Sequence, residues 1–123
     1  MMPLNIYTTL KPLLKGKKFN YDYESIIEFI EKYYRVNQYI YPGVLHRNLG
    51  IDIKDIYSFL DLCSNANILK PYFEVYCQNC NRFTGVFFDS IFSIPEEIEC
   101  PHCNNDIDDL LKSSVVIYKV IAR

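Results

Sequence analysis

Two pairs of cysteines constrain the fold of this chain more than any other feature. Cys77 and Cys80 form one pair with two residues between them, Cys100 and Cys103 form the other, and nineteen residues separate the pairs. A turn of this kind directs two sulfurs toward one metal ion, and two facing turns supply the tetrahedral four-sulfur set that zinc prefers. The spacing therefore predicts one structural zinc ion (Zn2+) held by all four cysteines, with no open position for catalysis.

Other uses of the same cysteines have to be weighed against this prediction. The letters of Cys100-Pro101-His102-Cys103 match the active-site motif of a disulfide oxidase of the thioredoxin fold, but no apolar helix follows them here. Disulfide bonds are disfavoured because the chain is expected to be intracellular. An iron–sulfur or mononuclear iron site could use the same four thiolates, so the choice between zinc and iron stays open.

The fifth cysteine and the two histidines are expected to take no part in chemistry. Cys63 has helical spacing to apolar neighbours, which favours a small core residue over a reactive thiol. His102 lies between two cysteines at the second turn and is expected to be exposed and unliganded. His46 is expected on the surface of a helix.

Strand-forming residues surround the cysteines. Aromatic and β-branched residues favour a strand over 82–89, and a short acidic strand over 96–99 is expected to lead into Cys100. Strand, turn and strand between two cysteine turns are typical of a zinc ribbon. The strongest strand signal covers 114–121, and a further strand is expected over 72–77.

The first half of the chain has a helical period instead. Asp22 is expected to cap a helix over 24–34. A second, short helix is expected to open at Pro42 and end at Gly50, and a third to cover 53–65.

These helices carry a pattern that resembles the winged helix-turn-helix family. The pattern includes Leu49-Gly50-Ile51 between the second and third helices and Asn67-Ile68-Leu69 after the third, and it covers roughly residues 22–77. Asn67 stands where the family usually has glycine, and asparagine adopts the left-handed conformation more readily than most residues. With the cysteine pairs added, the order resembles the alpha subunit of the archaeal general transcription factor E and its eukaryotic counterpart. The resemblance implies the architecture only, a winged helix followed by a four-cysteine ribbon.

The predicted fold class is α+β, a winged helix-turn-helix with a zinc ribbon inserted at the wing. In a winged domain the strand after the third helix pairs with a second strand across a loop, the wing. We expect the strands over 72–76 and 115–121 to pair antiparallel in this way. The predicted segments are a basic N-terminal segment (1–20), a winged-helix domain (21–76 with 113–123) and a zinc ribbon (77–112).

Composition limits the class of protein. Half of the residues are hydrophobic and 23% are charged, which excludes a disordered chain. No apolar run is long enough to span a bilayer, and the N-terminus lacks the order of residues of a secretory signal. We therefore expect a cytoplasmic protein without a membrane partner.

The formal net charge of −2 argues against a general electrostatic attraction of the whole chain to DNA. The expected exposed face of the third helix has one lysine against three carboxylates. These carboxylates and the phosphates of DNA would repel each other, which disfavours this helix as a DNA-recognition helix. The candidate nucleic-acid contacts are the lysines of the N-terminal segment, namely Lys11, Lys15, Lys17 and Lys18.

The expected function is that of a non-catalytic adaptor or regulatory subunit that docks a protein partner. The chain has no phosphate-binding Gly-rich loop, no open metal site and no recognisable catalytic set, so neither an enzyme nor a small-molecule substrate is expected. The main alternative is a DNA-binding transcriptional regulator. A third interpretation is a component of a bacterial defence or mobile-element system.

Overall fold

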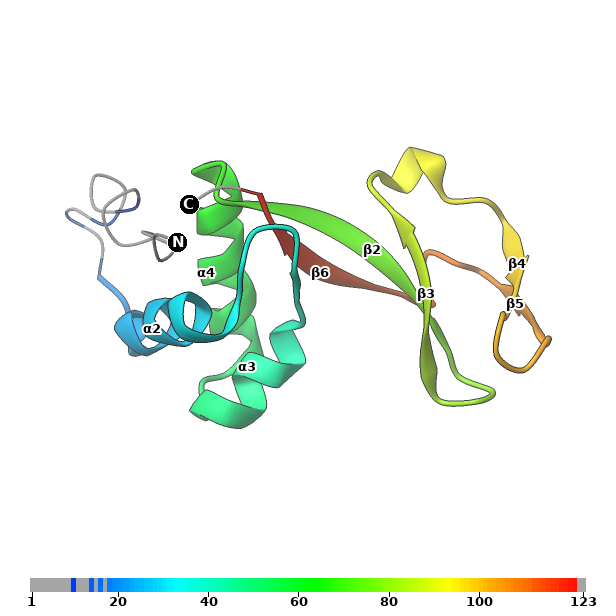
Figure 1. Ribbon diagram of the computed structural model, residues 1–123, viewed down its shortest axis with the longest axis horizontal. Helices are drawn as coiled ribbons and strands as arrows, with labels where there is room; N and C mark the ends of the chain where they lie inside the picture. Colours follow the sequence, from blue (N-terminus) through cyan, green and yellow to red (C-terminus); the bar gives the residue numbers. More distant parts are fainter. Residues whose placement is uncertain (1–9, 11–13, 15, 17, 122–123) are drawn as a thin grey trace. The chain divides into compact units, whose positions relative to one another are not determined.

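The computed structural model describes Leu10, Leu14, Gly16 and residues 18–121 (Figure 1). The fold class is α+β, as predicted, with three α-helices in this part of the chain and an antiparallel sheet. The chain divides into two compact units. The helical unit comprises Met1–Lys70 and Tyr118–Arg123, and the four-cysteine unit comprises Pro71–Ile117.

Three helices build the helical unit. Each lies within one residue of its predicted bounds at both ends, and α3 packs against both of the others. The helices are α2 (Tyr23–Tyr33), α3 (Pro42–Leu49) and α4 (Ile53–Asn65).

Local chemistry sets the ends of these helices. The carboxylate of Asp22 accepts a hydrogen bond from the backbone N–H of Ser25 and so caps α2. Helix α3 opens at a proline and ends at Gly50, whose φ of 67° is left-handed. Asn67 also takes a left-handed φ, of 61°, which confirms the role predicted for it after the third helix.

The inner faces of the helices form the core of the helical unit. On α4 the inward-facing residues Ile56, Phe59, Leu60 and Cys63 are completely buried, and residues of three strands belong to the same unit's buried set. The buried side chains are Leu10, Leu14, Ile26, Ile27, Ile30, Ile40, Pro42, Leu45, Ile56, Phe59, Leu60, Cys63, Ile68, Leu69, Tyr118 and Val120.

The main sheet has four strands in the order β1-β6-β2-β3. Strand β1 (Tyr39–Ile40) pairs antiparallel with β6 (Ser114–Val120). Strand β2 (Leu69–Cys77) lies on the other side of β6, where the N–H of Ile121 donates to the carbonyl of Ile68 at 2.9 Å. The antiparallel pairing predicted between these two strands is confirmed.

The four-cysteine unit adds two short hairpins. In the first, β2 pairs antiparallel with β3 (Arg82–Phe88), and in the second β4 (Glu97–Glu99) pairs with β5 (Asp106–Asp108). A 3-10 helix, η1 (Ile91–Ser93), lies between the hairpins along the chain. Strand β5 is not predictable from its own residues, because two of the three are aspartates, which are rare in strands. Pairing with β4 holds them extended.

Most of the basic N-terminal segment lies outside the described residues. Lys11, Lys15 and Lys17 belong to that part, whereas Lys18 is described and exposed. No helix in the described ranges is long and apolar enough to cross a bilayer.

Candidate metal centre

The four predicted ligands meet in the four-cysteine unit. Their Sγ atoms all lie within 4.8 Å of one another, with Cys77 and Cys103 3.7 Å apart and Cys80 and Cys100 3.8 Å apart. Four sulfurs at about 2.3 Å from a central tetrahedral ion would be about 3.8 Å from one another. The four sulfurs therefore fit a single tetrahedral ion, as the spacing predicted.

The two hairpins place these sulfurs in an equivalent way. Cys77 ends β2 and Cys80 lies in the turn before β3, while Cys100 and Cys103 occupy the turn between β4 and β5. The residue after each second cysteine, Asn81 or Asn104, has a left-handed φ, of 54° and 62° respectively. Asparagine tolerates this conformation, so each turn can bend back toward its own strand.

The four sulfurs are part of a hydrophobic core. Cys77 and Cys100 are almost fully buried, whereas Cys80 and Cys103 are half-buried. The buried residues packed with them are Val75, Ile107 and Leu110, and the partly buried residues are Val86, Phe88, Ile94 and Ile98. All of these residues belong to the four-cysteine unit, so the sulfurs connect its two hairpins at the centre of its own core.

The surroundings of Cys103 and Cys80 shift the pKa values of these two thiols in opposite directions. The side-chain amide of Asn79 donates a hydrogen bond to Sγ of Cys103 at 3.5 Å. This bond, together with one from the backbone N–H of Asn105, lowers the pKa of Cys103 to about 6. Desolvation and the neighbouring thiols raise the pKa of Cys80 to about 12. A metal binds the thiolate form, so its binding must displace the proton of a thiol with a raised pKa such as Cys80. Metal affinity therefore falls as the pH falls.

The amide of Asn79 supplies the first testable prediction. Replacing Asn79 with alanine removes the donor to Cys103 and raises the pKa of that thiol, so protons compete with the metal at higher pH. We expect a 10- to 100-fold loss of zinc affinity and release of the metal at a higher pH than in the parent. Titration against a coloured chelator at several pH values measures both effects. The control is Gln78→Ala, at the exposed neighbouring position, and an unchanged affinity in Asn79→Ala would contradict the role of this amide.

The other residues singled out in the sequence lie away from the four sulfurs. His102 is exposed and does not belong to the cluster of metal-binding groups. His46 is exposed on α3, with its Nδ1 2.6 Å from the carbonyl oxygen of Ile51. Cys63 is completely buried, which confirms its predicted place in the core, and desolvation raises the pKa of its thiol to about 12.

Sequence reasoning missed Asn79. The only available signal was its position inside the first cysteine turn, where a side-chain amide can reach a sulfur of the facing turn.

No protein-family model, curated protein or solved structure matches the chain.

Proposed function

We propose that the chain is a non-catalytic adaptor or regulatory subunit that docks a protein partner. One zinc ion, bound by Cys77, Cys80, Cys100 and Cys103, would stabilise its four-cysteine unit. The observation that carries the proposal is the closed set of four sulfurs inside a hydrophobic core. Four protein ligands leave no position for water or substrate, so such a metal has a structural role.

The order of elements supports a winged helix-turn-helix with a zinc ribbon inserted at the wing. Three helices precede β2, and β2 and β6 are neighbours in the sheet. Both cysteine pairs belong to the part of the chain that runs between these two strands, where a winged domain has its wing loop. Both modules serve as docking surfaces in multisubunit assemblies, which fits an adaptor.

Charge favours a protein partner over nucleic acid. On α4 the exposed side chains include Lys54 but also Asp61, and the exposed Asp52 caps the helix. The four-cysteine unit has eight Asp and Glu residues against Arg82 and Lys112, a net charge of −6. Four thiolates around Zn²⁺ would add a further charge of about −2. Phosphates would be repelled, whereas a basic protein surface would be attracted.

The alternative function is direct DNA binding as a transcriptional regulator. It is favoured by the four lysines of the N-terminal segment, of which Lys18 is exposed. This alternative predicts that phosphate contacts dominate the affinity.

Salt dependence separates the two functions. For the adaptor we expect duplex DNA to bind no more tightly than the roughly 10⁻⁴–10⁻⁶ M typical of non-specific binding, and a protein partner to co-purify from native cells. The Lys15→Gln, Lys17→Gln, Lys18→Gln triple variant should retain that partner. Fluorescence anisotropy against salt concentration, with mass spectrometry of the co-purified protein, measures both. Tight DNA binding that falls steeply with salt and weakens in the triple variant would instead establish the alternative.

A further inference from the structure

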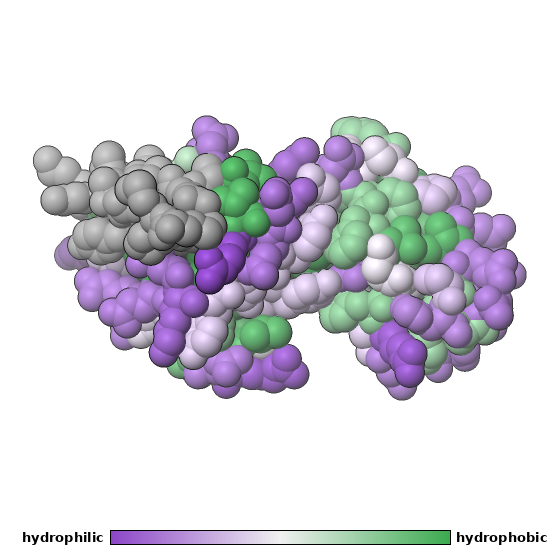
Figure 2. Space-filling view, viewed as in Figure 1, coloured by the Kyte–Doolittle hydropathy of each residue, from purple (hydrophilic) through white to green (hydrophobic). Residues whose placement is uncertain are grey.

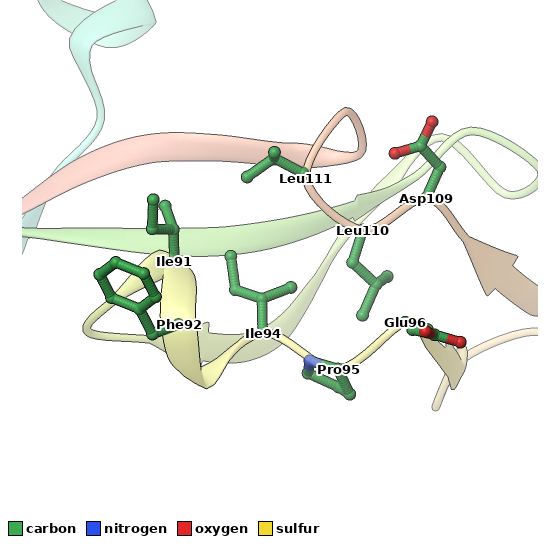
Figure 3. A pocket seen from close by; sticks show the side chains of 8 residues that line it. All are labelled: Ile91, Phe92, Ile94, Pro95, Glu96, Asp109, Leu110 and Leu111. Carbon is green, nitrogen blue, oxygen red and sulfur yellow. The ribbon is translucent and has the colours of Figure 1, made fainter.

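An apolar groove lies on the four-cysteine unit, away from its sulfurs. It has a volume of about 430 Å³, and η1, the segment before β4 and the segment after β5 line it. Figure 3 shows Ile91 and Phe92 at one end of the groove and Glu96 and Asp109 at the other. The remaining lining residues are Ile94, Pro95, Leu110 and Leu111.

The apolar end of this groove is strongly exposed. Phe92 is 93% exposed, Leu111 61% and Ile91 49%, while Leu110 beside them is buried in the core that holds the cysteines. In Figure 2, hydrophobic residues gather on the visible face around η1, with hydrophilic residues close by. An exposed apolar patch rimmed by polar residues is typical of a protein-binding site.

The β4–β5 hairpin, next to the other end of the groove, has carboxylates opposite each other on its exposed face. Glu97 lies directly opposite Asp108 and Glu99 opposite Asp106 in the β4–β5 hairpin, and all four side chains are exposed. Like charges directly opposite each other destabilise a pair of strands. The alternate face of the same hairpin has Ile98 opposite Ile107, which pack into the core. The hairpin therefore accumulates carboxylates on its outer face at a cost in stability.

This acidic face continues into the groove. Glu96 precedes Glu97, and Asp109 follows Asp108, so the first carboxylate pair of the hairpin adjoins the two acidic residues that line the groove. Lys112 Nζ lies 3.6 Å from Oδ2 of Asp109, in an exposed pair that is weak in water, and Glu96 supplies a second carboxylate at this end. The end of the groove formed by Glu96 and Asp109 therefore remains negative.

We propose that this groove binds a segment of a partner protein in which an apolar side chain stands next to lysine or arginine. The apolar side chain packs against Phe92, Ile91 and Leu111, and the basic side chain pairs with Glu96 or Asp109. This inference deepens the proposed function, on which it rests, by naming the surface and the chemistry of the partner.

Charge also selects this occupant over two others. A second copy docked through the same unit would bring two units with a net charge of −6 together, carboxylates against carboxylates. Nucleic acid would meet the same repulsion from its phosphates. A basic protein segment, by contrast, gains from both ends of the groove.

A random-peptide display library, selected on the zinc-loaded full-length chain, tests the proposal. We expect enrichment of peptides in which aromatic or aliphatic residues adjoin Lys or Arg. For a synthesised peptide from that set, Phe92→Ser should weaken binding at least tenfold. The double variant Glu96→Gln, Asp109→Asn should weaken it several-fold and flatten its salt dependence. Matched controls on the helical unit are Tyr33→Ser, at a position 58% exposed, and Glu28→Gln, which should bind like the parent.

Several outcomes would overturn this assignment. They are a lack of enrichment, enriched peptides without basic residues, and equal binding by the groove variants and the controls. Self-association in sedimentation experiments that Phe92→Ser abolishes would identify a second copy as the occupant instead. The proposed function is judged separately: a native partner retained by Phe92→Ser would leave the adaptor role intact and refute the groove.

Discussion

Metal removal is expected to unfold the four-cysteine unit while α2, α3 and α4 keep their structure. Cys77 and Cys100 are buried in that unit's core, and the four sulfurs come from both of the hairpins that pack together there. Structural zinc contributes roughly 10–16 kcal/mol of apparent binding free energy in small zinc-finger peptides. A whole domain has a net stability of only about 5–15 kcal/mol, so a unit of this size cannot lose such a contribution and remain folded.

Thiol labelling tests this prediction, because it measures the accessibility of each cysteine separately. After chelation, alkylation followed by mass spectrometry should modify the four clustered cysteines and spare Cys63, whose thiol is buried with its pKa raised to about 12. Cys100→Ser should behave like the chelated protein, whereas Cys63→Ala should retain one equivalent of metal. Elemental analysis of the purified protein distinguishes zinc from iron. A folded, protected four-cysteine unit with less than half an equivalent of either metal would refute the structural role.

Local signals in the sequence were sufficient for the three helices of the helical unit. An acidic cap at Asp22, a proline opening and glycine ending for α3, and an apolar period along α4 each act within one or two turns of the chain. Such signals need no knowledge of the tertiary fold, so the predicted bounds agree with the structure to within a residue. The cysteine spacing was equally informative, because two residues between ligands is a local geometric requirement of a shared metal.

Features that depend on distant segments escaped prediction. Strand β5 has the sequence Asp106-Ile107-Asp108, and only its pairing with β4 makes it a strand. The apolar groove arises because that same pairing brings the residues around η1 close to those after β5. Phe92 illustrates the limit, because local sequence does not tell which of the aromatic residues near the cysteines pack against the core and which stay exposed. The structure separates them, with Phe88 packed against the core and Phe92 exposed.

Truncation of Phe59 to alanine is expected to destabilise the helical unit by about 3–5 kcal/mol and to leave the metal site loaded. Phe59 is completely buried on α4, and its ring stacks on Tyr23 at 6.0 Å and meets Phe19 edge-on at 6.5 Å between centroids. The alanine variant therefore leaves a cavity lined by aromatic rings. Circular dichroism at 222 nm should show the helical transition at least about 12 °C lower than in the parent.

The metal content of this variant is the informative measurement. The core around the four sulfurs consists of residues of the four-cysteine unit, so loss of packing beneath α4 should not open it. Phe59→Ala should therefore retain a full equivalent of zinc after dialysis. The matched control is Phe92→Ala, at a position 93% exposed, which should change the stability by no more than about 0.5 kcal/mol. Release of the metal by Phe59→Ala would instead mean that the two units fold as one, because a cavity in the first would then have unfolded the second.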